Sequence, residues 1–540
     1  MKRHRGIKLV NGGLPAVLLY ILFFGLISLY IITSSISNPL SHDEHQFVAS
    51  GAVLVNNGWL PYADYPFFHA PLLALIYGAL FASNWPLLLS ARIFSCVCML
   101  GTLIAVFYGI QKAFHPREVP YKRLVALIIV LTLLTCMVVR FSMGYAWNHD
   151  LPVLTFIIAF LILAFNLQKI EPWKAFLVGF LLAISWCVRL SFAPLVLPFF
   201  AFLLYSAHKS SGKILKNVLG FSAGIIASSL PFIYFILWYP QQTLFGNLIY
   251  PALNKSWYAA KGSDRAFSLW DKVKYIINDV NYLPFDANIL GEYGINRIFF
   301  MLGICAIITG VIVIWKGGYL KMHFAFWLAC LPFTLLGSFA ATPPQLQYFY
   351  PLFIWFALGI GWMAAYWMGV IIGTPKQKIV IKYIGVAAVG VVILFTGRIV
   401  SLIPDMNFKE CDACKILTQA NILKNTITKG RVLTLAPIIP LEAGLDIIPG
   451  FVTGPFAWRV SGHMPEKTRA QMRVMSTNHM IQLFKDNQPE IILTGYEDAR
   501  LEKMFFEYAK ELGYYSMPLP TITGRKTMMY LSPTILSSGS

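Results

Sequence analysis

Residues 14–46 read LPAVLLYILFFGLISLYIITSSISNPLSHDEHQ, an apolar block followed at once by a cluster of ionisable side chains. A helix needs about 20 apolar residues to cross the hydrocarbon layer of a bilayer, and the block at 14–33 has that length. It follows the basic start Met1-Lys-Arg-His-Arg, but it is too long for the apolar core of a signal peptide and has no small-residue cleavage site. We therefore expect an uncleaved first membrane span.

Similar apolar blocks recur along the whole chain. The protein is 57% apolar and only 12% charged, which is about half the charged fraction of an average soluble protein. We predict spans at about 14–33, 89–110, 124–140, 151–168, 175–188, 192–206, 218–238, 297–315, 323–340, 350–371 and 382–402. The expected fold class is a polytopic α-helical membrane protein of about eleven transmembrane helices, with a small C-terminal α/β domain.

The loops between these spans alternate in charge. Every second loop is basic, namely 1–8, 112–123, 169–174, 207–216, 316–321 and 373–382, and the positive-inside rule places such loops in the cytoplasm. The stretch 35–91, in contrast, contains no Lys or Arg. We expect a cytoplasmic N-terminus, with the loop 35–88, the loop 239–296 and the C-terminal region on the outer side. The net charge of +19 is spread over short loops, whereas nucleic-acid binding needs one basic face, so nucleic acid is not an expected partner.

Two domains are expected, a membrane domain at 1–402 and a soluble extracytoplasmic domain at 403–540. In the first outer loop, the apolar pieces at about 45–57 and 70–83 are too short to span, and we interpret them as interfacial helices. In the tail, short strands are predicted at Arg431-Val-Leu-Thr-Leu, Glu490-Ile-Ile-Leu-Thr and Lys526-Thr-Met-Met-Tyr-Leu, and amphipathic helices at 467–486 and 498–512. Cys411 and Cys414 lack the second ligand pair of a zinc site, so a local disulfide is favoured.

The cluster Ser41-His42-Asp43-Glu44-His45-Gln46 is the first candidate site. One interpretation is only structural, because Asp is favoured at the start of a helix. The functional interpretation is a general base or a metal ligand held at the outer membrane surface. The candidate ligands of a divalent metal are Glu44, His45 and Asp150, and neither interpretation is excluded by spacing alone.

Further ionisable residues are expected on the same side of the membrane. Asp150 begins the fourth span and is either a helix cap or a second acidic site. Arg189 ends a short hairpin, where it either reaches lipid phosphate or binds an anionic ligand. Arg92 has the same ambiguity, and Gln347 and Tyr348 precede the tenth span. Two acids and two cations on one membrane face indicate an anionic lipid headgroup and a nucleophile that must lose a proton.

These residues resemble the motifs of the GT-C glycosyltransferases that use polyprenyl-phosphate sugars, in the branch of the protein O-mannosyltransferases and lipid A aminoarabinose transferase. The resemblance covers roughly residues 14–372. It rests on Asp43-Glu44 after the first span, Tyr65-Pro-Phe-Phe-His69-Ala-Pro-Leu72, Ser90-Ala-Arg92-Ile-Phe-Ser95, Asn148-His-Asp150-Leu-Pro152, Ile184-Ser-Trp-Cys-Val-Arg189-Leu-Ser-Phe-Ala-Pro194 and Tyr348-Phe-Tyr-Pro351. Gln347 departs from the pattern, since Arg is usual there.

The resemblance implies roles for these residues. Asp43 would be the catalytic base, with Glu44 and Asp150 as further acidic catalytic residues. The donor phosphate would be bound by Arg189, His69, Arg92, Tyr348 and Gln347. The sugar would move from a polyprenyl phosphate to an extracytoplasmic lipid, glycan or protein with inversion, in a bacterial inner membrane, with a divalent metal as an open question. The alternatives are a transporter or flippase of lipid-linked sugars, and a polysaccharide polymerase or ligase.

Overall fold

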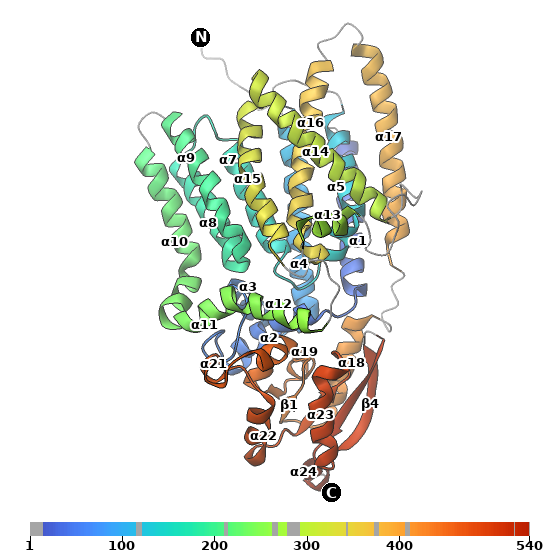
Figure 1. The fold of residues 1–540 in the computed structure, drawn as a ribbon. Coiled ribbons are helices and arrows are strands. Elements are labelled where there is room, and N and C mark those ends of the chain that lie inside the picture. Colours follow the sequence, from blue (N-terminus) through green and yellow to red (C-terminus); the bar gives the residue numbers. More distant parts are fainter. Residues whose placement is uncertain are drawn as a thin grey trace.

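The computed structural model describes residues 14–114, 121–209, 214–261, 268–277, 292–341, 344–371, 377–404, 411–522 and 524–538. A bundle of helices forms the larger part, and a smaller part with a β-sheet covers one end of the bundle (Figure 1). The predicted basic loop 1–8 lies outside the described residues, as do parts of the loops 112–123, 207–216, 239–296 and 373–382.

Within the described ranges, eight helical segments are long and apolar enough to cross a membrane. They belong to α1 (Leu14–Ser37), α4 (Leu87–Ala113), the 3-10 turn η1 (Leu190–Leu195) with α9 (Val196–Lys209), α10 (Ile214–Trp238), α14 (Glu292–Lys316), α15 (Lys321–Phe339), α16 (Tyr350–Ile371) and α17 (Gln377–Leu402). The protein is therefore a multi-pass integral membrane protein, and the predicted fold class is confirmed. The exact count of eleven spans stays a prediction.

Three of the predicted spans correspond to helices of fewer than 18 residues in the structure. α7 (Asp150–Ala164) has 15 residues and α8 (Pro172–Val188) has 17. The predicted span at 124–140 is divided into α5 (Lys122–Thr135) and α6 (Met137–Ser142), because Cys136 between them has extended backbone angles, φ −65° and ψ 131°. All three segments are apolar, as expected, but apolar composition does not report where a helix is interrupted.

Helices α8 and α10 approach each other through glycine. A Cβ atom at Gly179 would lie 2.2 Å from the carbonyl oxygen of Phe221, and one at Gly224 would lie 2.1 Å from that of Phe176. Gly220 and Gly224 form a Gly-x-x-x-Gly pair on α10. Small residues at this spacing let two membrane helices come into backbone contact, where dispersion forces replace the hydrophobic effect that lipid cannot supply.

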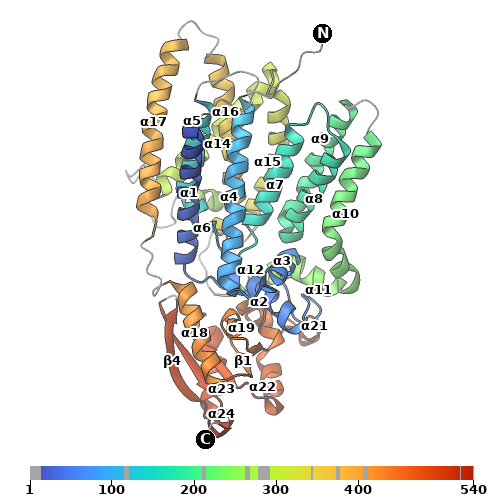
Figure 2. The same cartoon turned by 180° about the vertical axis from the view of Figure 1, so that it is seen from behind.

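Short helices lie across the end of the bundle that faces the C-terminal part. They are α2 (His42–Asn57), α3 (Leu72–Phe81), α11 (Pro240–Leu244), the π-helical turn η2 (Phe245–Ile249) and α12 (Tyr250–Ala260). Opposite views place α2, α3, α11 and α12 at this level (Figures 1 and 2). α13 (Leu269–Ile277) and the 3-10 turn η3 (Leu346–Tyr348) complete the membrane part. Both predicted pieces of the first outer loop are thus helical, while their place at the membrane interface stays a prediction.

The C-terminal part is a five-stranded mixed sheet flanked by helices. The strand order is β2-β1-β3-β5-β4, with β1 parallel to β2 and β3, and β5 antiparallel to β3 and β4. The strands are β1 (Arg431–Leu433), β2 (Asp446–Ile447), β3 (Ile491–Thr494), β4 (Tyr515–Ile522) and β5 (Arg525–Leu531). The helices are α18 (Asp412–Thr426), α19 (Ile438–Glu442), α20 (Pro455–Val460), α21 (Glu466–Gln471), α22 (Thr477–Asp486), α23 (Ala499–Glu511) and α24 (Pro533–Ser538), with 3-10 turns η4 (Pro449–Phe451) and η5 (Ser461–His463). The predicted helix 467–486 is divided because Arg473 has a left-handed φ of 58°.

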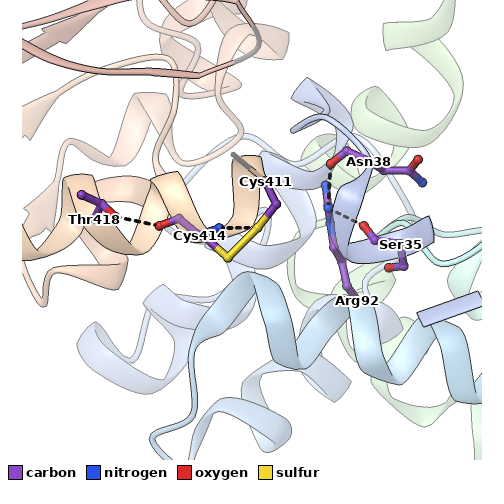
Figure 3. Close-up of a disulfide and its surroundings, with 6 residues drawn as sticks. All are labelled: Ser35, Asn38, Arg92, Cys411, Cys414 and Thr418. Atoms are coloured by element: carbon purple, nitrogen blue, oxygen red, sulfur yellow. Dashed lines mark hydrogen bonds between the residues drawn. A yellow bond between two sulfur atoms is a disulfide. The ribbon is translucent and has the colours of Figure 1, made fainter. Parts of the chain in front are cut away.

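Side-chain carboxylates connect this part to the bundle. Asp412 accepts a hydrogen bond from the backbone amide of Leu40 at 2.9 Å, and Glu442 accepts one from the amide of Leu87, at the start of α4, at 2.8 Å. The expected disulfide between Cys411 and Cys414 is present at the start of α18, and Figure 3 shows it close to Arg92 of α4. Unpaired amides at helix starts are satisfied by such acceptors, so the two parts are joined by directional contacts.

Candidate active site

A cavity of about 730 Å³ lies where the bundle, the short helices and the C-terminal part meet. This volume is within the range of small-molecule sites, roughly 300–1,000 Å³. The predicted site residues on its wall are Asp43, His69, Arg189, Gln347 and Tyr348. Glu44, Arg92 and Asp150 are not among the lining residues.

Asp43 stands in the first turn of α2, where a capping box fixes the backbone. The Ser41 hydroxyl accepts from the Asp43 amide at 3.3 Å, and the Glu44 carboxylate accepts from the Ser41 amide at 3.0 Å. The side chain of Asp43 is 25% exposed and has two long polar contacts, to Gln347 Nε2 at 3.5 Å and to His42 Nε2 at 3.6 Å. A carboxylate that faces a cavity with only weak partners is available to accept a proton.

Glu44 and Arg92 form a fully buried ion pair behind this turn. Both side chains are 0% exposed, and Arg92 donates to the two carboxylate oxygens through Nε and Nη2, each at 2.8 Å. The remaining Arg92 donors go to the carbonyl oxygens of Ser35, Asn38 and Pro39 (Figure 3 shows the first two). All five guanidinium N–H groups are thereby used. The structure therefore does not support a direct contact of Arg92 with donor phosphate, nor of Glu44 with substrate.

Asp150 is also buried away from the cavity. One of its oxygens accepts from the Tyr350 hydroxyl at 2.7 Å and the other accepts from the Gly144 amide at 3.0 Å. The neighbours His149 and Asn148 reach the wall instead. Asp150 thus positions the turn that carries them, and the geometry does not support the direct catalytic role expected from the sequence.

Arg189 faces the cavity from the junction of α8 and η1. Its backbone is extended (φ −145°, ψ 105°), which ends α8 and points the side chain to the wall. The guanidinium lies 5.3 Å from the ring centre of Tyr348 and is hydrogen-bonded to His149 Nδ1. Among the residues that the structure describes, no carboxylate forms an ion pair with it. A half-buried cation at the wall of a cavity, without an ion-pair partner in the described part of the chain, favours an anionic ligand.

His69 reaches the wall from the loop between α2 and α3. Its ring contacts Phe47, with 5.0 Å between ring centres, and Nδ1 lies 3.4 Å from the Asn148 side-chain nitrogen. Burial, followed by the charges of Arg189 and Arg459, lowers the pKa of His69 to about 3. The imidazole is therefore neutral at physiological pH before a ligand binds, so it offers a hydrogen bond and not a positive charge.

The comparisons with known proteins rest on structure. No protein-family model matches the chain, and no curated protein matches its sequence. Among solved structures, it is similar to ArnT from Cupriavidus metallidurans bound to undecaprenyl phosphate, with a TM-score of 0.57 and 10% identity over 94% of this chain and 98% of that one. The chain has the GT-C fold. A weaker likeness, TM-score 0.46 with 11% identity, is to the archaeal oligosaccharyltransferase AglB from Archaeoglobus fulgidus in complex with an inhibitory peptide and a dolichol-phosphate, over 95% of this chain and 75% of that one.

In this GT-C fold, the cavity also has wall residues that sequence reasoning missed. Tyr250 and Asn247 come from the helices after α10, and Phe456 and Arg459 come from α20 in the C-terminal part. No local motif marks them, because they reach the cavity only through the docking of α12 and α20 against the bundle. An arginine directly after two aromatic residues, in Phe456-Ala-Trp-Arg459, is the sole signal that the sequence gives.

No group of three or more His, Cys, Asp or Glu side chains within the described part of the chain is placed to hold a metal ion. The predicted candidates Glu44, His45 and Asp150 are all buried, and they are not brought together as one ligand set. Glu44 is engaged by Arg92, and Asp150 by Tyr350.

Proposed function

We propose that this protein is a membrane glycosyltransferase that moves a sugar from a polyprenyl phosphate to an acceptor on the outer side of the membrane. The observation that carries the proposal is that one cavity, at one end of the membrane bundle, is lined by both the carboxylate of Asp43 and the guanidinium of Arg189. Among the described residues, Arg189 forms no ion pair. The similarity in fold to ArnT, which was solved with undecaprenyl phosphate, supports a lipid phosphate as the donor. The orientation with the C-terminal part outside follows from the loop charges.

The chemistry follows from these two groups. The acceptor hydroxyl or amine attacks the anomeric carbon while the bond from that carbon to the phosphate oxygen breaks. The proton of the nucleophile passes to Asp43, and the bonding electrons leave with the polyprenyl phosphate. This leaving group is already acidic, so it needs stabilisation of its charge by Arg189 and no general acid. A one-step displacement inverts the anomeric centre.

Supporting groups complete this proposed site. Tyr348 lies beneath the Arg189 guanidinium, and Gln347 contacts Asp43. The turn η3 therefore positions both the proposed phosphate-binding residue and the proposed base. Glu44 and Arg92 hold the α2 turn that carries Asp43. Asp150 holds the turn of His149, which contacts Arg189. In this proposal, the buried residues Glu44, Arg92 and Asp150 are positioning residues.

The test is a donor panel with the purified full-length protein in lipid nanodiscs. Polyprenyl phosphates that carry different radiolabelled hexoses or pentoses are supplied with a cell-envelope extract as the source of acceptor. Release of free polyprenyl phosphate, measured by mass spectrometry, is the common product whatever the acceptor is. If no donor is consumed while vesicles with the protein move labelled donor across the bilayer, a flippase is correct instead. A polyprenyl-pyrophosphate-linked glycan is supplied in a parallel reaction, and its consumption in place of the monophosphate donors would indicate a polymerase or ligase.

A further inference from the structure

A second arginine reaches the same cavity from the C-terminal part of the molecule. Arg459 of α20 is 7% exposed and lines the cavity wall. Its Nη2 donates to the Tyr250 hydroxyl at 3.2 Å, and its guanidinium lies 4.3 Å from the ring centre of Phe456 and 5.1 Å from that of Trp257. Its Nε is buried and has no hydrogen-bond partner.

This environment gives Arg459 aromatic contacts in place of a directly paired carboxylate. Within the described ranges, no carboxylate forms an ion pair with it. Contacts with aromatic faces offset part of the cost of burying the charge, but they do not satisfy a buried N–H donor. A buried guanidinium with a free donor at the wall of a cavity is suited to an anionic ligand with oxygen acceptors.

The two arginines of the cavity approach it from different sides. Arg189 comes from the membrane bundle and contacts Tyr348, whereas Arg459 comes from the C-terminal part and contacts Tyr250. Both lie close enough to Asp43 for its charge to act on them. The donor in the proposed function has one phosphate, attached to a chain that must stay in the bilayer, and Arg189 is on that side. The donor therefore does not account for Arg459.

We propose that Arg459 binds an anionic group of the acceptor, a phosphate or a carboxylate, and thereby selects acceptors with negative charge close to their nucleophile. This inference rests on the proposed function, because it assigns the donor phosphate to Arg189. It gives the C-terminal part a direct task in substrate recognition, which is to supply the acceptor side of the cavity. Arg459 is in this sense a specificity-determining residue, and proton removal stays with Asp43.

The test measures binding to the full-length protein in nanodiscs, with and without saturating undecaprenyl phosphate. The probes are glucose 1-phosphate, glucuronate and the neutral methyl glucoside, so that phosphate and carboxylate are distinguished. Arg459→Gln removes the charge, Arg459→Lys keeps it, and Arg500→Gln is the matched control at an exposed arginine of the same domain (side chain 71% exposed). Arg189→Gln reports on the donor side.

The wild type is expected to bind at least one anionic probe about tenfold more tightly than methyl glucoside, as one charged hydrogen-bond pair implies. Arg459→Gln abolishes this preference, and Arg459→Lys and Arg500→Gln retain it. Undecaprenyl phosphate affinity falls about tenfold in Arg189→Gln and changes less than about twofold in Arg459→Gln.

Two results would overturn the inference. One is an anionic preference that persists in Arg459→Gln, and the other is a loss of undecaprenyl phosphate affinity in Arg459→Gln as large as that in Arg189→Gln. Absence of undecaprenyl phosphate binding by the wild type would contradict the proposed donor instead. In that case, binding of the sugar probes to the protein without lipid would still show whether the anionic preference depends on Arg459.

Discussion

The position of Asp43 is determined by the residue that follows it. Glu44 accepts from the Ser41 amide and so closes the first turn of α2, while the same carboxylate is paired with Arg92. The backbone of Asp43 is thus held from both sides, and its side chain is left to face the cavity. In the proposed mechanism, this combination gives a base with a fixed position and no strong competing partner.

Replacement of Asp43 by Asn tests the base. Asn keeps the size of the side chain but does not accept a proton, so turnover is expected to fall by about 10²–10⁴-fold, the usual contribution of a general base. Polyprenyl phosphate release in the donor assay measures this, with Asp446→Asn, an exposed aspartate of the C-terminal part, as the control. Turnover within a few-fold of the wild type would assign the base to another group. Unchanged donor binding would show that the cavity is intact.

Replacement of Glu44 by Gln tests the buried pair. It leaves the Arg92 charge without its counter-charge at 0% exposure, and breaking such a pair costs roughly 3–5 kcal/mol. We expect a large fall in the melting temperature of the detergent-solubilised protein. Glu507→Gln is the matched control, because its partner Lys503 is 70% exposed and exposed pairs contribute about 0–1 kcal/mol. Equal melting temperatures for the two variants would contradict the positioning role of Glu44.

The sequence predicts some of these residues better than others. Asp43, His69, Arg189, Gln347 and Tyr348 were expected from motif and sidedness, and the structure brings them to one cavity. Glu44, Arg92 and Asp150 were expected for the same reason, but an ionisable residue beside a site has the same sequence signal whether it faces substrate or supports its neighbour. The pairing of Glu44 with Arg92 depends on how α2 packs on α4, which spacing along the chain does not encode.

At the scale of elements, apolar length predicts helices well and their interruptions poorly. The block at 350–371 has the same bounds as α16, and the block at 218–238 ends with α10, which begins earlier, at Ile214. The break at Cys136 has no Pro or Gly to mark it, and α6 contacts η3 close to the cavity. Arg459 was missed for a related reason, since α20 has six residues and a helix so short has no periodicity to read.

The contact between α8 and α10 gives a prediction at this scale. Gly224→Ala places a methyl group 2.1 Å from the Phe176 carbonyl oxygen, so the helices must separate. We expect a lower melting temperature by an amount that corresponds to about 1–3 kcal/mol, as for an overpacked core. Gly390→Ala in α17, where nothing lies within 4 Å, is the control and is expected to be neutral or slightly stabilising. A neutral Gly224→Ala would show that this helix contact adapts without cost.

At the scale of the whole molecule, the C-terminal part is docked through two carboxylates, Asp412 and Glu442, which accept hydrogen bonds from backbone amides of the membrane part. Glu442 has a shifted pKa. Burial raises the pKa of Glu442 to about 7, although the hydrogen bonds from the Leu87 and Leu88 amides act in the opposite direction. The folded protein therefore binds this proton more tightly than the unfolded chain, whose glutamate has an ordinary pKa near 4.3. The stability that neutral Glu442 contributes is fully present below the pKa of the unfolded chain, and it is lost as the pH rises through about 7.

Replacement of Glu442 by Gln should remove this dependence, because the amide oxygen still accepts from Leu87 and carries no charge. The variant is expected to match the wild type at pH 5 and to have the higher melting temperature at pH 8.5, where the wild type must bury a carboxylate. Melting curves of the detergent-solubilised protein at both pH values measure this. Glu511→Gln, at an exposed position of α23, serves as the control. A constant difference at both pH values would contradict titration of Glu442 in this range.

The distribution of the cavity wall along the chain has a consequence for biosynthesis. Asp43 is synthesised long before Arg459, because most of the membrane bundle lies between them in the chain. At about 5–20 residues per second, roughly 20–80 s separate the synthesis of these two residues. For most of that interval, the nascent chain holds Asp43 and Arg189 but lacks the wall that α20 supplies. A chain at that stage lacks the acceptor side of the cavity as proposed above, so selection of an acceptor has to wait for the synthesis and docking of α20.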